Sequence, residues 1–246
     1  MKADHFDQQK LLALAAEDVA LAQLAHRRRT LPELAAVDTA AEAERGLTEQ
    51  AVRAETEVRD LQREVKRLEG DVDTVRQRAA KDQRLLDSGS VSAKQMTDLQ
   101  HELQSLARRQ SDLEDTELEL MEQLETAENA LAAAQEGQQA AQTELTRAEQ
   151  ARDDALADVA DQTAVHEKAR AEAAGTVPAD LLALYERIRA QTGSTGAAML
   201  KARQCQGCRI ELFGRELAAV RNADPHEVVR CDNCGRILVR TAESGL

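Results

Sequence analysis

Apolar side chains recur along much of the chain with alternating steps of four and three residues. One series spans positions 47–86, and only Asp82 interrupts it. A second series spans positions 96–131, with Gln110 and Glu117 at its two polar positions. An average step of 3.5 residues keeps apolar side chains on one side of a helix and is the repeat of a coiled coil. The pattern therefore predicts two long helices, each with a continuous apolar seam.

The segment LLDSGSVSAKQ between the two series carries signals for one helix end and one helix start. Gly89 can adopt the left-handed conformation that ends a helix. Ser92 and Gln95 have the spacing of a capping box, which starts the next helix. The chain is therefore expected to reverse near residues 87–91.

The two seams also match each other when the chain folds back. Residues that face each other in an antiparallel hairpin have numbers with a constant sum, and a sum of 178 pairs most apolar positions, such as Val72 with Leu106. Three of the paired layers would each contain one polar residue, which lowers stability but discourages slipped registers. Independent seams need not match around so short a turn. The pattern thus favours an intramolecular hairpin over a parallel dimer and predicts a monomer or weak oligomer.

A proline divides the N-terminal part of this helical region. Pro32, in the segment HRRRTLPEL, breaks or kinks a helix, and Thr30 with Glu33 has the spacing of a second capping box. Residues 4–29 are therefore expected to form a separate helix, with a kink near 30–32. The basic run at 26–29 fits a helix C-terminus better than a nucleic-acid contact, because cations suit that end of the helix dipole.

Composition agrees with a helical rod rather than one globular core. Only Tyr185, Phe6 and Phe213 are aromatic, and charged residues make up 31% of the 246 residues. Aromatic rings supply much of the apolar area of an ordinary core, whereas this composition is that of a long helix or coiled coil. The regular leucines and valines also distinguish the chain from a disordered one.

Charge is divided unevenly along the chain. Residues 1–200 hold 24 Lys/Arg and 39 Asp/Glu, a net charge of −15, while residues 201–246 hold 8 and 6, a net charge of +2. The long acidic part would repel a phosphate backbone, so nucleic acid could approach only the C-terminal part. The start MKADHFDQQK lacks the pattern of a signal peptide, and no apolar run approaches the roughly 18 residues of a membrane span. The sequence predicts a cytoplasmic protein without membrane contact.

A joint is expected between the helical region and the C-terminal part. Gly175 and Pro178 would end the returning helix, and a short helix with one apolar face would follow and dock the terminal module. We therefore predict an antiparallel hairpin over residues 1–174, a joint over 175–196 and a terminal module over 197–246.

All the cysteines lie in two CxxC pairs of the terminal module: Cys205, Cys208, Cys231 and Cys234. Cytoplasmic thiols stay reduced, so paired CxxC motifs indicate a metal rather than disulfides. Four thiolates complete the tetrahedral coordination of one Zn²⁺ ion, which makes the site structural and closed to catalysis. A dithiol oxidoreductase fits less well, because no βαβ pattern accompanies the pairs. The stretches VVRC and RILVR have the character of short strands, so the fold class is all-α hairpin plus a small β zinc ribbon.

Arginines surround the metal motif, and four of them are candidate contacts for a partner or for nucleic acid: Arg203, Arg209, Arg236 and Arg240. Zinc with four thiolates adds two negative charges, which leaves the module near neutral and favours protein recognition over nucleic acid. The chain has no phosphate loop, nucleophile–base arrangement or open metal position, so we do not expect an enzyme. The leading hypothesis is an adaptor that binds protein partners. The alternative is an RNA- or DNA-binding protein that uses these arginines.

Several stretches together resemble one family: HRRRTLPEL, LLDSGSVSAKQMTDLQHELQ with its continuation ELELMEQLE, LLALYERIR, CQGC and CDNCGRILV. They are similar to bacterial coiled-coil proteins with a C-terminal C4-type zinc ribbon, long described as a domain of unknown function. The resemblance implies a helical hairpin with a ribbon at its base and the four cysteines as zinc ligands. Some relatives are adaptors in flagellar gene expression that contact an alternative sigma factor or a messenger RNA, which implies a partner in the transcription machinery. The flagellar role is not transferred, because the Ala- and Arg-rich composition is typical of high-GC bacteria, which often lack that sigma factor.

Overall fold

The computed structural model describes residues 1–246 as two compact units. The hairpin unit comprises residues 35–149, and the ribbon unit combines residues 1–34 with 150–246. Two long helices, α2 (Pro32–Asp87) and α3 (Ala93–Gly175), contribute to both units. No helix is both long enough and apolar enough to cross a bilayer.

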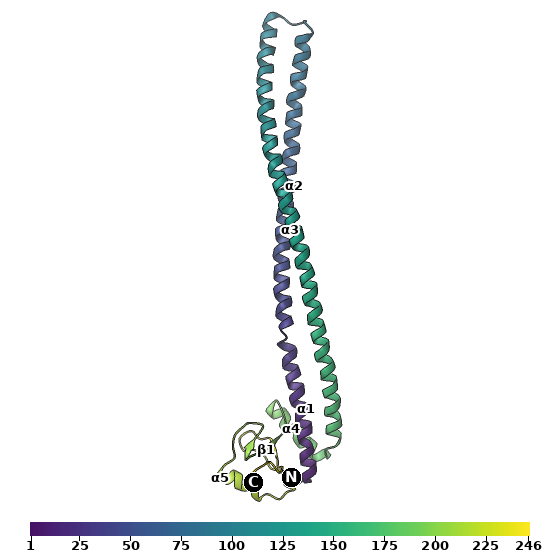
Figure 1. Ribbon diagram of the computed structural model, residues 1–246, viewed down its shortest axis with the longest axis vertical. Coiled ribbons are helices and arrows are strands. Elements are labelled where there is room, and N and C mark those ends of the chain that lie inside the picture. Colours follow the sequence, from purple (N-terminus) through teal and green to yellow (C-terminus); the bar gives the residue numbers. More distant parts are fainter. The chain divides into compact units, whose positions relative to one another are not determined.

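The hairpin unit is an antiparallel pair made by α2 and α3, joined through residues 88–92 (Figure 1). Gly89 adopts the expected left-handed conformation with φ +63°. The Gln95 side-chain oxygen accepts from the Ser92 N–H at 2.9 Å, and the Gln95 N–H approaches Ser92 Oγ at 3.4 Å. The capping box predicted at the start of α3 is therefore confirmed.

The buried residues of the hairpin unit all lie on the predicted apolar series. They are Ala51, Val58, Leu68, Val72, Leu113 and Ala127. Because no residue off the series is buried in this unit, the 3.5-residue repeat identified the packing face correctly. The seam and the antiparallel coiled-coil fold are confirmed.

The predicted register of the two seams is wrong by one heptad. Leu113 packs in one cluster with Leu68 and Val72, and Gln138 Nε2 donates to Thr48 Oγ1 at 2.9 Å. The numbers of Val72 and Leu113 add to 185 and those of Thr48 and Gln138 to 186, instead of 178. Registers seven residues apart present equivalent seam positions to each other, so a heptad pattern alone cannot separate them.

Residues near the turn show what the observed register gains. In the predicted register Met96 faces Asp82 in the last layer before the turn, and Leu86 lies beyond that layer without an apolar partner. In the structure Met96 is 39% exposed, whereas Leu86 is half-buried, level with Leu99 in the observed register. Covering one more leucine at the cost of an exposed, flexible methionine favours the observed alignment.

In the ribbon unit the first helix, α1 (His5–Arg29), runs beside the last part of α3 and ends two residues before α2. Thr30 closes α1, because its N–H and its hydroxyl both donate to the His26 carbonyl oxygen, at 3.2 and 3.0 Å. The second predicted capping box is therefore wrong. With only Thr30 and Leu31 between the helices, Thr30 serves the end of α1 rather than the start of α2.

A short helix, α4 (Ala179–Thr192), buries Leu181, Tyr185 and Ile188. These side chains form one core with residues from α1, from the connection before α4 and from the sheet: Leu11, Leu14, Ala15, Val177, Ala197, Ile237 and Val239. The core of the ribbon unit thus joins helices from both ends of the chain with the metal-binding module.

The sheet of the ribbon unit has the order β2-β1-β3. Its central strand β1 (Ala197–Lys201) pairs antiparallel with β2 (Gln204–Cys205) and parallel with β3 (Ile237–Val239). The stretch RILVR forms β3 as expected, but VVRC contributes only an isolated bridge. The structure also adds β1, β2 and a helix between the cysteine pairs, α5 (Gly214–Asn222), none of which was predicted.

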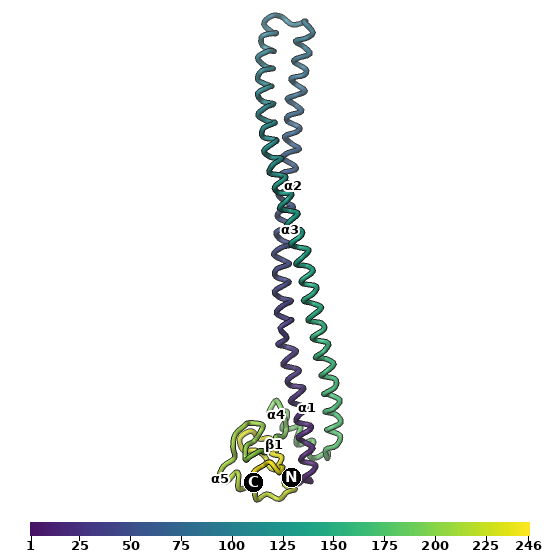
Figure 2. The backbone as a smooth tube through the Cα atoms, viewed as in Figure 1, coloured from purple at the N-terminus to yellow at the C-terminus, as the bar shows by residue number.

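The first residues of the chain extend this module. The Ala3 N–H donates to the His226 carbonyl oxygen at 2.8 Å, and the Val228 N–H donates to the Met1 carbonyl oxygen at 3.1 Å. Both chain ends accordingly lie at the ribbon in Figure 2. The ribbon is completed by backbone that the sequence places more than two hundred residues away.

Candidate metal centre

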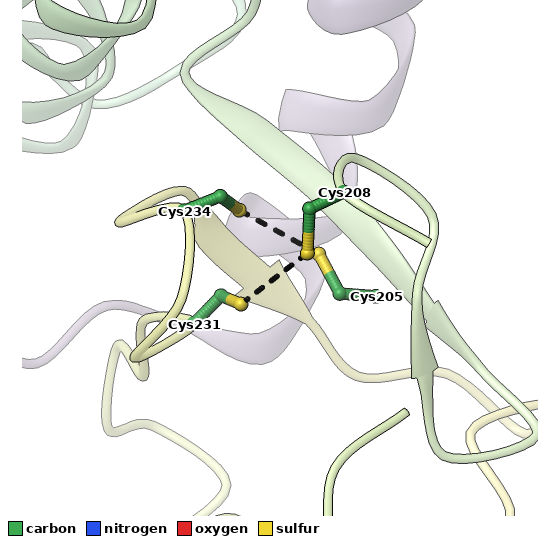
Figure 3. Close-up of side chains that lie close together, drawn as sticks. All are labelled: Cys205, Cys208, Cys231 and Cys234. Atoms are coloured by element: carbon green, nitrogen blue, oxygen red, sulfur yellow. Dashed lines mark hydrogen bonds between the residues drawn. The ribbon is translucent and has the colours of Figure 1, made fainter. Parts of the chain in front are cut away.

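Two turns of the chain bring the four cysteine sulfurs together. Cys205 is the last residue of β2 and Cys208 lies in the turn that follows, whereas Cys231 and Cys234 come from the turn before β3 (Figure 3). All four Sγ atoms lie within 4.8 Å of one another, and the Cys205–Cys234 and Cys208–Cys231 pairs are 3.8 Å apart. Sulfurs bound tetrahedrally at about 2.3 Å from zinc are about 3.8 Å apart. The sulfur spacing fits one tetrahedral zinc ion.

The two turns have the same backbone geometry. The Arg209 N–H donates to the Cys205 carbonyl oxygen at 2.7 Å, and the Gly235 N–H donates to the Cys231 carbonyl oxygen at 2.8 Å. Both donors lie in the left-handed region, with φ +61° for Arg209 and +74° for Gly235. Glycine adopts this conformation freely, whereas arginine does so at a cost. The first turn therefore holds an arginine where the equivalent position of the second turn is glycine.

Gly207 is required for a different reason. A Cβ atom at this position would lie 2.7 Å from Arg236 Cδ and 3.0 Å from Ala198 Cβ. The close approach of β1 and Arg236 to the first turn leaves no room for a side chain. Glycine is needed at position 207 for space, whereas at Gly235 it is needed for backbone conformation.

The environment of the thiols controls their protonation. Burial raises the pKa of Cys231 to about 12 and raises that of Cys205, although neighbouring backbone N–H groups oppose both shifts. At Cys208, burial is outweighed by hydrogen bonds from the Ile210 N–H and the Asn233 side chain, which lower the pKa to about 7. Such donors also stabilise a thiolate bound to metal. A metal ion must therefore displace protons from Cys205 and Cys231 when it binds at neutral pH.

The sulfur cluster lies inside a small apolar core. Cys205 and Cys231 are buried with five apolar neighbours: Ala198, Leu200, Leu212, Val220 and Leu238. Burial on this scale keeps water away from two of the four sulfurs. Four protein ligands with no open position suit a structural role and leave no place for a reacting water.

One of the four candidate arginines is part of the interior. Arg240 is 9% exposed, and its guanidinium donates to the carbonyl oxygens of Ala223, Asp224 and Glu227 at 2.8, 2.7 and 2.8 Å. These carbonyls follow the end of α5. Arg240 therefore holds the loop between α5 and the second cysteine pair and is not a surface group.

The other three candidates differ in how far they are engaged. Arg236 Nε donates to the carbonyl and hydroxyl oxygens of Thr195 at 3.1 Å, and Arg203 Nε donates to the Gly245 carbonyl oxygen at 3.1 Å. The guanidinium of Arg209 has no partner and is exposed. Arg209 is the candidate most available to another molecule.

A buried ionic cluster in the ribbon unit was missed by the sequence analysis. The carboxylate of Asp18 is fully buried; Oδ1 lies 2.7 Å from Arg170 Nε and 2.8 Å from Arg189 Nε. Its Oδ2 accepts from the Tyr185 hydroxyl at 2.5 Å. Burial, followed by this hydrogen bond, raises the pKa of Tyr185 above its ordinary range.

This cluster joins three helices, since Asp18 lies on α1, Arg170 on α3, and Tyr185 and Arg189 on α4. A signal for it was present in the sequence. Asp18 falls at helical spacing from Leu11 and Leu14, so a carboxylate occupies a position of the apolar stripe of α1. A charged residue on a buried stripe requires a partner.

Comparison with known proteins gives the same two parts. The CT398-like coiled coil hairpin domain matches residues 14–193, and the C4-type zinc ribbon domain matches residues 204–238. The chain belongs to the CT398-like coiled-coil hairpin family. Its C4-type ribbon and the clustered sulfurs show that the cofactor is one structural zinc ion.

Relatives of similar length exist in mycobacteria. An uncharacterized protein of Mycobacterium tuberculosis strain H37Rv is 40% identical over 240 residues, which are 98% of each chain. One from Mycobacterium leprae is 32% identical over 222 residues, 89% of this chain and 94% of the relative. The family relationship therefore extends along nearly the whole chain.

Two solved structures share the fold. A protein from Mycobacterium smegmatis aligns with a TM-score of 0.88 at 36% identity, covering 98% of this chain and all of the other. CT398 from Chlamydia trachomatis aligns with a TM-score of 0.68 at 18% identity, covering 96% and 98%. At that lower identity the second likeness shows the fold alone.

Proposed function

We propose that this protein is a cytoplasmic, non-enzymatic adaptor whose hairpin and ribbon each bind a protein partner, one of them a component of the transcription machinery. The observation that carries the proposal is an apolar pair beside the metal site. Ile210 is 46% and Phe213 66% exposed, next to the unpaired Arg209. Aromatic, aliphatic and arginine side chains on a rigid support are the residue types that dominate protein interfaces.

In this proposal the metal has a mechanical role. Cys205, Cys208, Cys231 and Cys234 are the four zinc ligands, and the ion fixes the loop that carries the apolar pair. A preformed loop loses little conformational entropy when a partner binds. We further propose that residues 197–246 act as the recognition segment, with 175–196 as its joint and 1–174 as the hairpin.

A second surface on the hairpin unit supports a basic partner. A groove of about 910 Å³ lies between α2 and α3 in the hairpin unit. Its carboxylates outnumber its single arginine, Arg53; they belong to Glu57, Asp60, Glu64, Glu119 and Glu122. A surface of this charge attracts cationic partners and repels anionic ones, nucleic acid included.

Nucleic-acid binding through the arginines around the zinc has less support. Arg240 is buried, and Arg203 and Arg236 are engaged with backbone carbonyls, which leaves Arg209 as the free cation among the four candidate arginines. A salt titration with RNA and DNA tests this alternative. Binding that falls steeply with salt and depends on Arg209 would favour it.

Affinity purification from the native host, followed by mass spectrometry, tests the adaptor proposal. We expect a specific partner that is recovered by the intact protein and lost from a variant with Ile210→Ser and Phe213→Ser. Phe6→Ser is the matched control, because Phe6 is 72% exposed and lies on α1 rather than on the segment between the two cysteine pairs. Recovery of the same proteins with the double variant as with the control would contradict the proposal.

A further inference from the structure

A leucine-lined groove lies where α1 ends and α2 begins, within the ribbon unit. It has a volume of about 550 Å³. Its walls are largely apolar and come from the last turns of α1, the first turn of α2 and α3: Leu21, Leu24, Ala25, Leu34, Leu156, Val159 and Thr163. Leu24 and Val159 are buried at its floor, while Leu21, Leu34 and Leu156 are half-buried. The helix break therefore leaves part of an apolar face uncovered.

Arg28 stands between this groove and a second hollow. The second hollow, of about 240 Å³, shares Leu156 and Val159 with the first, and Arg28 lines both. Glu167 contributes one carboxylate to the second hollow. Arg29 lines the larger groove only. We call the two hollows together the Arg28 groove.

The two arginines of this groove are unpaired. Arg27, their neighbour, lies 3.4 Å from Asp158 in an exposed ion pair, whereas the guanidinium groups of Arg28 and Arg29 make no hydrogen bond or ion pair and are exposed. The dipole at the end of α1 favours cations in general. It does not account for two free guanidinium groups beside a leucine-lined groove in a chain with a net charge of −13.

We propose that the Arg28 groove binds an acidic amphipathic helix of a partner protein. Leucine-type side chains spaced at i, i+3 or i+4 and i+7 would enter the groove, and carboxylates beside them would pair with Arg28 and Arg29. The apolar lining distinguishes this ligand from nucleic acid. A second copy of this chain, which is itself acidic and helical, is distinguished from a partner protein by the dimerisation measurement below. The groove is a third surface, beyond the two of the adaptor proposal.

Peptide binding tests the proposal on the full-length, zinc-loaded protein. The probe is a fluorescein-labelled helical peptide of about 16 residues with leucines on one face and glutamates beside them. One twin replaces each glutamate by lysine, and another replaces each leucine by serine. Anisotropy titration should show saturable binding of the acidic peptide and at least tenfold weaker binding of both twins.

Protein variants locate the binding site. Arg28→Gln combined with Arg29→Gln should weaken the acidic peptide roughly threefold to tenfold, the effect of two exposed charge pairs. Leu21→Ser with Leu34→Ser should weaken it further by reducing the apolar lining, with helicity and zinc content measured to confirm folding. Arg187→Gln is the control, since Arg187 is exposed and unpaired on α4; it should leave affinity unchanged.

Each contrary outcome overturns the proposal. One such outcome is that the acidic peptide does not bind, and another is that its lysine twin binds equally well. A third is that the affinity for the acidic peptide is the same for the wild-type protein and for the Arg28→Gln, Arg29→Gln variant. Displacement of the peptide by phosphatidylglycerol vesicles, with tighter binding of the vesicles themselves, would assign the groove to an anionic lipid. Concentration-dependent dimerisation that Arg28→Gln abolishes would assign it to a second copy. The Ile210 and Phe213 pull-down is unaffected by these results, so the two proposals can fail separately.

Discussion

The hairpin unit and the ribbon unit bury their side chains to different depths. In the hairpin unit the most buried seam residue is Val72 at 2%, and its partners Leu68 and Leu113 retain 6% and 7% exposure. In the ribbon unit Leu11, Leu181 and other core residues reach 0%. Two helices can cover only one face of each other, whereas helices, a sheet and a metal site together enclose a core on all sides.

This difference teaches how each unit specifies its structure. The hairpin repeats one kind of layer, so its stability is spread along the seam and a neighbouring register is almost equivalent. The ribbon unit depends on a few non-repeating contacts: four sulfurs, one buried carboxylate and one short helix. We expect damage to stay local in the hairpin and to spread in the ribbon unit.

Removal of zinc should give the largest effect and separate the two units. Structural zinc contributes roughly 10 kcal/mol to folding in small metal-binding modules. Chelation, or Cys231→Ser, should unfold the ribbon while most far-UV helicity remains. Amide exchange should show lost protection around residues 197–240 and retained protection in the hairpin seam. Simultaneous loss of both signals would show that the units fold as one.

Acid should release zinc by the same route. The raised pKa values of Cys205 and Cys231 mean that both thiols carry protons at neutral pH without metal, so zinc binding expels at least two protons. Zinc affinity should therefore fall at least about a hundredfold for each unit of decreasing pH near neutrality. Competition with a chromophoric chelator across pH 6.5–8 measures how zinc affinity changes with pH. An affinity that does not change with pH would contradict the release of protons on zinc binding.

Asp18→Asn should test whether damage spreads in the ribbon unit. Removing a buried charge that holds Arg170, Arg189 and the Tyr185 hydroxyl should cost about 3 kcal/mol. Tyr185 is the single tyrosine and the chain has no tryptophan, so tyrosine fluorescence reports on this unit alone. Asp161→Asn is the control at an exposed, unpaired position of α3. Equal midpoints in urea for the two variants would show that the ionic cluster adds nothing.

Leu113→Ala should test whether damage stays local in the hairpin. Loss of its contacts with Leu68 and Val72 should cost about 2 kcal/mol, at the low end for a buried leucine because the seam is open at its sides. Amide protection should fall in the hairpin unit, with zinc affinity and tyrosine fluorescence unchanged. Leu118→Ala, at a position 60% exposed on the same helix, is the matched control. A drop in zinc affinity would contradict the separation of the units.

Arg209→Gly should give the smallest change in stability, and unlike the other variants it should stabilise the protein. Relief of the left-handed strain, less the entropy that glycine adds to the unfolded chain, should stabilise the zinc-bound ribbon by about 0.5 kcal/mol. Arg209→Ala keeps the strain and serves as the control. If both variants lower the thermal midpoint equally, the arginine side chain stabilises the turn and its conformation is not a burden.

The sequence determined some features because their signals are local or periodic. The seam, the cap at Ser92 and the clustering of the cysteines all follow from spacing within short windows. The register does not follow from spacing, because heptads repeat. Neighbouring registers differ mainly in whether Leu86 or Met96 is covered near the turn. The strand β1 and the helix α5 were missed because short segments depend on packing rather than on their own propensity. Arg240 looked like a surface cation until its carbonyl partners near Ala223 were known.

The pairing of residues 1–3 with the segment 226–228 also constrains when the protein can mature. On the ribosome, the first backbone partner emerges some two hundred residues before the second, and the cysteine pairs follow the whole hairpin. The hairpin can fold while synthesis continues, but the zinc site can form only after the second cysteine pair has been synthesised. Until then, both the N-terminal segment and the thiols remain open to chaperones, proteases and competing ions.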